Sequence, residues 1–99
     1  MKQIKKLADS IKKNLKLAHE DIEAALMFKE TDRDLAEMYA DHSKQALSMI
    51  DDMHSQAVRL IRENRNNAPP EMLAMWEFLH QQQIEDEADV RRMHDMFRG

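Results

Sequence analysis

The feature that most constrains the fold is an apolar side chain that returns at every third or fourth position between residues 4 and 25. The spacings alternate between four and three along Ile4, Ala8, Ile11, Leu15, Ala18, Ile22 and Ala25. This alternation places all seven side chains on one face of an α-helix, as in coiled coils and helical bundles. It predicts a helix over about residues 2–29, and the small Ala side chains allow a neighbouring helix to approach closely.

Two segments interrupt the helical pattern, "KETDRDL" at residues 29–35 and "RNNAPPE" at residues 65–71. In the first, Thr31 or Asp32 can cap the helix that follows. The second holds the only two Pro residues of the chain, and a Pro pair sets the first turn of a helix. We therefore predict a second helix over about residues 32–66 and a third over about residues 69–98, all in one domain, 1–99.

The fold class predicted is all-α: a long antiparallel three-helix up-down-up bundle, because the connections between the helices are short. The stripe predicted for the second helix runs through Leu35, Tyr39, His42, Ala46, Met49, Met53, Gln56 and Leu60, flanked by Leu47, Ile50, Ala57 and Ile61. The stripe predicted for the third runs through Met72, Trp76, Leu79, Gln83, Asp86, Val90, Met93 and Phe97, with Leu73, His80, Ile84 and Ala88 alongside. Gln83 and Asp86 stand where Leu would be expected, which predicts a buried polar layer.

Composition narrows the class of protein. The chain has no Cys, which excludes disulfides and thiolate metal sites and is typical of the cytoplasm. The basic start lacks an apolar signal region, so we expect neither a signal peptide nor a membrane span. Residues 1–17 carry six Lys and one Asp, whereas the other 82 residues carry 18 acids and nine Lys or Arg. A basic end on an acidic body favours head-to-tail pairing with another copy or contact with an anionic surface.

Two histidines on the second and third helices are expected to meet. If the second turn centres near residue 67, His54 and His80 each lie thirteen residues from it and stand at the same height. Each follows an acid by three residues, Asp51 in "DDMH" and Glu77 in "EFLH". Acid and imidazole at positions i and i+3 share a helix face, and such pairs hold metal ions in carboxylate bundles.

This arrangement leaves two interpretations open. His54, His80, Asp51, Glu77 and Glu20 are candidate ligands of an Fe, Mn or Zn ion, although no cofactor is needed to explain them. Alternatively, the two histidines form a neutral buried pair, hydrogen-bonded to each other or to Gln83 or Asp86. A second and more distant group, His19, His42 and His94 with Glu20 or Glu23, is predicted at the far end of the bundle.

The middle of the chain resembles a known family. "DRDLAEMYADHSKQALSMIDDMHSQAVRLI", then a Pro-containing turn, then "MWEFLHQQQIEDEADVRRM", is similar to small ferritin-like, rubrerythrin-related helical proteins found in phages and prophages of gut bacteria. The resemblance covers most of residues 19–97. It implies a helical hairpin plus a third helix, completed into a bundle by oligomerisation.

The resemblance also implies iron ligands, and this sequence departs from them. Fuller members of the family carry a Glu in the first helix and Glu-x-x-His in the second. Here the corresponding positions are His19, Ala46 and Met49, and neither Ala nor the Met thioether suits a hard iron centre. The usual di-iron site is therefore degenerate, while His54 and His80 match the family pattern.

Three classes of function follow. The first is a non-enzymatic, phage-type helical interaction protein that forms a homodimer or higher oligomer and binds a protein partner, such as a phage component or a host defence factor. The chain has no Gly-rich phosphate loop, Ser-His-Asp spacing or Cys nucleophile. The second is a metal-binding ferritin-like protein, with ferroxidase-like chemistry as its enzymatic form. The third, membrane or nucleic-acid binding by the basic first helix, is not expected because aromatics are absent from residues 1–27.

Overall fold

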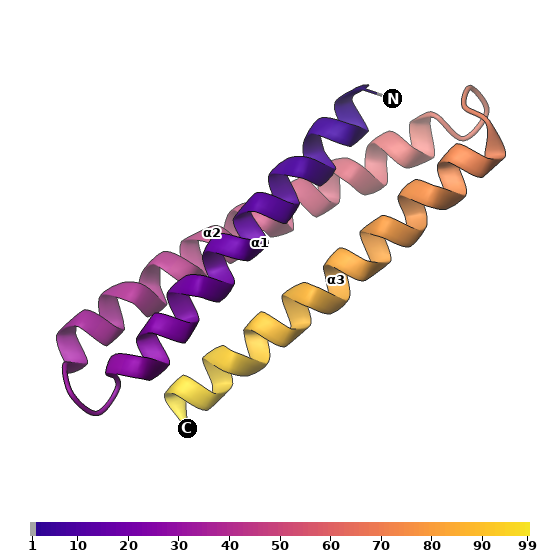
Figure 1. Ribbon diagram of the computed structural model, residues 1–99. Coiled ribbons are helices and arrows are strands. Elements are labelled where there is room, and N and C mark those ends of the chain that lie inside the picture. The colour runs from indigo at the N-terminus through magenta and orange to yellow at the C-terminus, as the bar shows by residue number, and fades with distance from the viewer. Residues whose placement is uncertain (1) are drawn as a thin grey trace.

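The protein is all-helical, as the computed structural model of residues 2–99 shows. Its helices are α1 (Lys2–Phe28), α2 (Arg33–Glu63) and α3 (Pro70–Arg98). Figure 1 shows α1 and α3 running in the same direction and α2 running in the opposite one. Side by side, they form a rod of 54 × 17 × 15 Å.

The helix ends follow local hydrogen bonding. The Asp32 side chain caps α2 by accepting a bond from the Leu35 amide at 3.2 Å. Helix α2 ends at Glu63, three residues before the predicted end. There the Asn64 backbone and side-chain amides both donate to the Leu60 carbonyl, at 3.1 and 2.8 Å. Helix α3 begins at Pro70. Proline has no backbone N–H, and the N–H of a first helical residue has no acceptor within the helix, so nothing is lost at this position.

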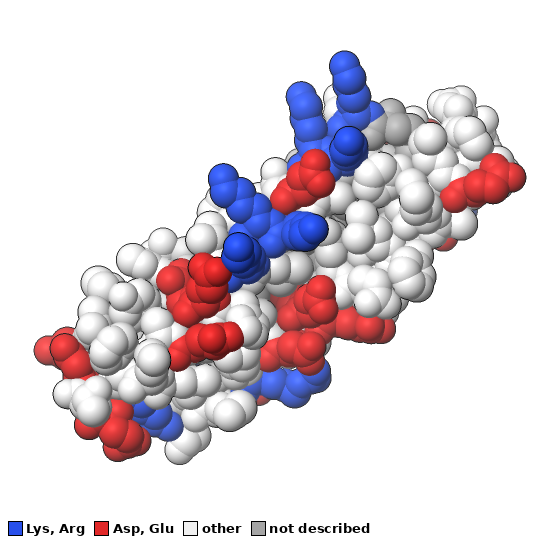
Figure 2. Space-filling model, viewed as in Figure 1, with Lys and Arg blue, Asp and Glu red and all other residues white. Residues whose placement is uncertain are grey.

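Charge is segregated along the rod. Figure 2 shows Lys side chains gathered over the first half of α1 and acidic side chains over its second half and over the C-terminal half of α3. The Lys residues before position 17 are exposed. No helix among residues 2–99 combines the length and apolar content needed to cross a membrane.

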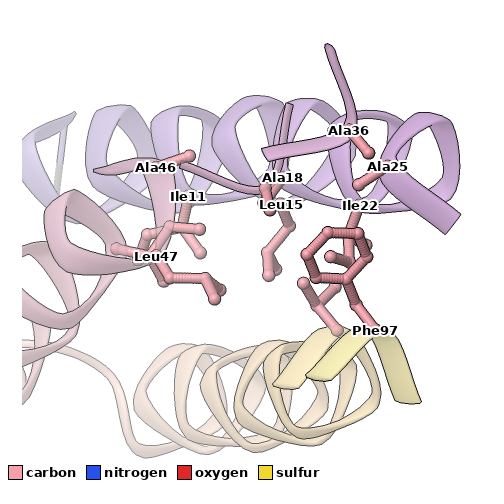
Figure 3. Packing of buried hydrophobic residues seen from close by; sticks show 12 residues of the cluster. Ile11, Leu15, Ala18, Ile22, Ala25, Ala36, Ala46, Leu47 and Phe97 are labelled. Carbon is pink, nitrogen blue, oxygen red and sulfur yellow. The ribbon is translucent and has the colours of Figure 1, made fainter. Parts of the chain in front are cut away.

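The core lies mainly between α1 and α2. The seven predicted residues of α1 are all buried, which confirms the stripe on this helix. Ala18 and Ala25 of α1 and Ala36 of α2 are fully buried, so the two helices pack closely. Phe97 of α3 packs against this cluster from the opposite side (Figure 3), and Val90 of the same helix also belongs to it.

On α2 the centre of the predicted stripe was wrong by one residue along most of its length, whereas the residues predicted at its flank, Leu47, Ile50, Ala57 and Ile61, are buried. The buried residues are Ala36, Ala40, Ser43, Ala46, Leu47, Ile50, His54, Ala57 and Ile61. His42, Met49 and Gln56 are exposed instead. The prediction favoured large side chains, whereas the close approach of α1 selects the Ala-rich face.

On α3 the predicted stripe contains the buried residues Gln83, Val90 and Phe97, and Leu73, predicted alongside it, is also buried, whereas buried Glu87 and His94 were not predicted. Asp86, predicted to be buried, is exposed. Large apolar side chains remain in solvent on the N-terminal half of this helix, with Met75 56% and Phe78 68% exposed. Helix α3 therefore has an apolar face that this chain does not cover.

Candidate functional site

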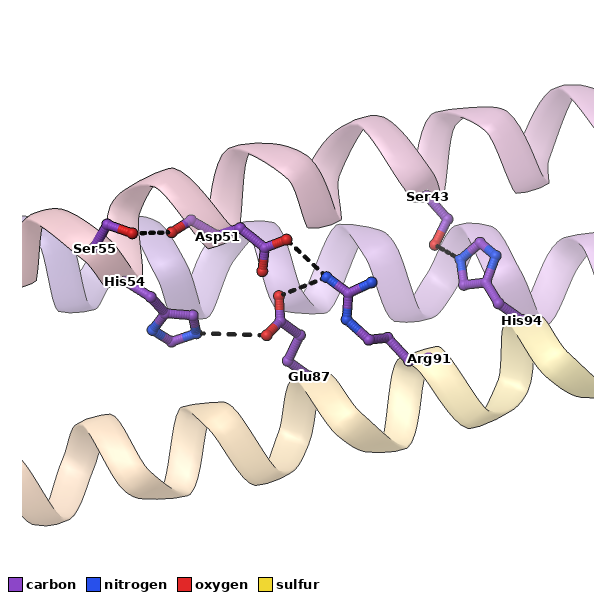
Figure 4. Close-up of polar contacts among 7 residues, drawn as sticks. All are labelled: Ser43, Asp51, His54, Ser55, Glu87, Arg91 and His94. Atoms are coloured by element: carbon purple, nitrogen blue, oxygen red, sulfur yellow. Dashed lines mark hydrogen bonds and ion pairs between the residues drawn. The ribbon is translucent and has the colours of Figure 1, made fainter.

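A cluster of titratable side chains lies between α2 and α3 near the middle of the rod. We call Asp51, His54, His80, Glu87 and Arg91 the central polar cluster. Helix α2 contributes Asp51 and His54, and α3 contributes the other three, spaced by seven and four residues. Figure 4 shows the chain of contacts that runs from His54 through Glu87 and Arg91 to Asp51.

The predicted meeting of His54 and His80 is present. Their ring centroids lie 4.7 Å apart with the ring planes at 70°, an edge-to-face contact. Burial lowers the pKa of both rings, and the neighbouring His80 lowers the pKa of His54 further while Asp51 opposes this. Both imidazoles are therefore neutral at pH 7.

The hydrogen bonds predicted for the two histidine rings are not formed. Within residues 2–99, both ring nitrogens of His54 and Nε2 of His80 are buried without a hydrogen-bond partner. Gln83 donates its amide to the Ala8 carbonyl on α1 at 3.0 Å instead of reaching the rings. Unpaired buried polar atoms cost stability, so these nitrogens mark a place where the fold is not optimised for stability alone.

Glu87 is the buried acid of the cluster, and the sequence analysis missed it. Its Oε2 lies 3.9 Å from Nε2 of His54 and its Oε1 lies 3.4 Å from the Arg91 guanidinium. Burial, together with the hydrogen bond and the charge of Asp51, raises the pKa of Glu87 to about 7, although Arg91 works in the opposite direction. The sequence does contain a signal for the burial of Glu87. This residue lies seven positions after His80 and four after Gln83, which places all three on one face of the helix.

Asp51 is an ion-pair partner in this arrangement. The Arg91 guanidinium donates to its Oδ2 at 2.8 Å. Burial raises the pKa of Asp51, but hydrogen bonds from Glu87 and Arg91 outweigh that effect, so the pKa is lowered. The pKa values of the two carboxyls are therefore shifted in opposite directions, so Asp51 loses its proton at a lower pH than Glu87.

The other two predicted ligands lie on the surface. Glu77 is exposed and lines a hollow between α2 and α3 with His80 and Val58. Glu20 is exposed on α1, in a shallow hollow with Met27. Across residues 2–99 no three or more His, Asp or Glu side chains are arranged to hold a metal ion, so the predicted ligand set is not assembled.

The predicted second histidine group is also dispersed. His19 pairs with Glu23 at 2.7 Å on the surface of α1, and His42 is exposed. His94 is buried, with Nε2 2.8 Å from the Ser43 hydroxyl. That hydroxyl donates to the Ala18 carbonyl at 2.7 Å, so the His94 ring is the donor in the pair and Ser43 has no base to activate it.

A groove runs between α1 and α3 on the face seen in Figure 2. This α1–α3 groove has a volume of about 480 Å³ and an apolar floor that includes Leu15 and Val90. Lys12 and Lys16 line its α1 wall, and Asp86 and Asp89 line its α3 wall. The groove therefore combines an apolar floor with walls of opposite charge.

Comparisons of the chain with protein-family models, curated proteins and solved structures found no match. Its function is therefore argued from geometry. Two features of the structure bear on function. One is the central polar cluster with its unpaired imidazole nitrogens, and the other is the uncovered face formed by α3 and the α1–α3 groove.

Proposed function

We propose that this protein is a non-enzymatic helical interaction protein that associates with another chain through the uncovered face of α3. The observation that carries the proposal is the exposure of three large apolar side chains, Met75, Phe78 and Leu79, which we call the α3 patch. In this proposal the helices are an up-down-up, ferritin-like bundle that lacks one helix. The partner supplies the missing contacts.

The α3 patch is contiguous because residues at positions i, i+3 and i+4 are neighbours on a helix surface. Its members are 56%, 68% and 36% exposed, in chain order. An apolar patch bordered by charged residues is typical of a protein-binding surface. The resemblance to phage and prophage proteins suggests a cytoplasmic partner of phage or host origin, and an inhibitor of host defence is one form of this function.

The proposal is tested by placing a photo-crosslinking residue at position 78 in cells that produce the protein. Position 59, which is also exposed but lies on α2 away from the α3 patch, is the control. We expect one defined crosslinked product from position 78, reproduced with purified components and lost on Met75→Glu. The same products from both positions, or none from position 78, would refute the proposal.

A second candidate function is binding of a transition-metal ion by the central polar cluster. It is favoured by the unpaired nitrogens of His54 and His80 and by a carboxylate oxygen of Glu87 at 3.9 Å from the first ring. A Zn²⁺ ion with bonds of about 2.0–2.2 Å can bridge two donors at that separation. The second imidazole would have to turn toward the ion to complete the site, since residues 2–99 hold no ready-made set of ligands.

Calorimetric titration of untagged protein with Zn²⁺, Mn²⁺ and Fe²⁺ tests this candidate. Binding at a ratio of one ion per chain, abolished in His54→Ala and retained in the exposed control His42→Ala, would support it. Equal heats from both variants would place any binding elsewhere and eliminate the central polar cluster as a metal site.

A further inference from the structure

We propose that the chain associated with the uncovered face is a second copy of this protein, packed antiparallel along the α1–α3 groove about a twofold axis. The inference rests on the proposed function and names its partner. Three observations support it: the order of charges along the face, the apolar side chains at its two ends, and the area that it offers.

The face is continuous because α1 and α3 run in the same direction and are hydrogen-bonded to each other near the middle of α3 and near its C-terminal end. Gln83 bonds to the Ala8 carbonyl near the start of α1, and Lys29 after its end bonds to the Met96 carbonyl. The groove occupies the middle, where Lys12 and Lys16 face it. A twofold axis through the groove, normal to the rod, would bring the first half of one copy onto the second half of the other.

Charge along α1 changes sign between the two halves. Lys5 lies seven residues before Lys12, and Glu23 lies seven residues after Lys16, so both stay on the groove side of the helix. Up to residue 16, α1 carries six Lys and one Asp, and beyond it α1 carries three acids and no Lys or Arg. Antiparallel pairing sets each basic half over an acidic half, whereas parallel pairing would oppose like charges.

The apolar side chains at the ends of the face match in the same arrangement. Met75 and Leu79 lie at the end where α1 begins, and exposed Met27 and Met96 lie at the opposite end. Gln82 and Asp89 of α3 line the groove. Met75 lies seven residues before Gln82 and Met96 lies seven residues after Asp89, so both Met side chains are on the groove side of the helix. After the twofold rotation, Met75 and Leu79 of one copy stand at the level of the other copy's Met27 and Met96.

The area of the chain agrees with such a pairing. Its accessible surface is 6729 Å², roughly 800 Å² more than the about 5,900 Å² of a compact monomer of its 11.7 kDa mass. A stable dimer interface covers about 800 Å² on each partner. The rod shape of 54 × 17 × 15 Å accounts for this excess, which is comparable to the area that each partner covers in such an interface.

Charge reversal in trans tests the orientation. Lys5 and Lys6 lie at least fourteen residues from Glu20 and Glu23, about 21 Å along α1, so these groups do not pair within one chain. All four are exposed, and their reversal does not disturb the core. The two variants are Lys5→Glu with Lys6→Glu, and Glu20→Lys with Glu23→Lys. Reversal of the exposed Lys44 and Arg59 on α2 is the control.

Mass is measured by analytical ultracentrifugation at micromolar concentration. We expect the wild type and the α2 control to be dimers, each α1 variant alone to be a monomer, and an equal mixture of the two α1 variants to form a dimer again. A monomeric wild type, variants that remain dimeric alone, or a mixture that stays monomeric would overturn the proposal. A chain that carries all four reversals should again form a homodimer in antiparallel packing. Stronger pairing of this chain with wild type than with itself would show parallel packing and also overturn the proposal.

This result is separable from that of the proposed function. A monomeric wild type that still gives a defined crosslink from position 78 to a different protein would remove the second copy and keep the interaction function. A monomer with no such crosslink would remove both.

Discussion

Glu87 offers the sharpest test of the electrostatics in this fold, through the substitution Glu87→Gln. Burial and the adjacent Asp51 raise the pKa of Glu87 from 4.5 to about 7. The folded chain therefore holds this proton more tightly than the unfolded chain does. Between pH 4.5 and 7 the stability contributed by this group falls as pH rises, and above pH 7 it stays constant.

The size of the effect follows from the shift. Raising the pKa from 4.5 to about 7 corresponds to about 3 kcal/mol when Glu87 is fully ionised. Glu87 is 8% exposed, so solvent screening reduces this value little. Because part of the effect is already present at pH 5, the change between pH 5 and pH 8 is about 2–3 kcal/mol.

Gln keeps the shape and the carbonyl acceptor of Glu87 and cannot ionise. We expect the free energy of unfolding of Glu87→Gln, relative to wild type, to rise by about 2–3 kcal/mol from pH 5 to pH 8. Urea denaturation with a chelator present measures it, and exposed Glu85→Gln is the charge-matched control. The same difference at both pH values would refute the reasoning.

Three further predictions concern stability. Ser43→Ala removes two buried hydrogen bonds and is expected to lower the free energy of unfolding by about 1–3 kcal/mol, with exposed Ser48→Ala near zero in the same urea experiment. Ala18→Leu overpacks the contact between α1 and α2 and is expected to cost about 1–3 kcal/mol by thermal denaturation, and an equal result for exposed Ala74→Leu would contradict the close packing. Asp32→Ala removes the cap of α2 and is expected to cost about 1 kcal/mol, whereas Asp32→Asn, which keeps an acceptor, should restore most of it.

The number of helices and their approximate ends could be predicted from the sequence because both depend on local features of the chain. The alternating stripe of α1 and the Pro pair before α3 depend only on spacing and on backbone chemistry. The meeting of His54 and His80 was predictable for the same reason, because it needs only helix direction and the rise per residue.

The faces of α2 and α3 were harder to predict because neighbouring residues on a helix point about 100° apart. A stripe through His42 and Met49 and one through Ser43 and Ile50 differ by a single residue, and hydropathy favours neither clearly. The choice depends on how closely α1 approaches, which is a property of the assembled pair. The same one-residue shift explains why Asp86 was predicted to be buried and Glu87 was missed.

The Ala-rich contact between α1 and α2 has a consequence for the order in which the chain opens. Helices joined by a short turn and packed closely along their whole length form a unit with mostly local contacts, which favours rapid formation. Helix α3 adds a thinner set of contacts, including a polar cluster with unpaired nitrogens. Amide hydrogens of α3 should therefore exchange with deuterium at lower opening free energies than those of the α1–α2 hairpin, so detachment of α3 would precede global unfolding.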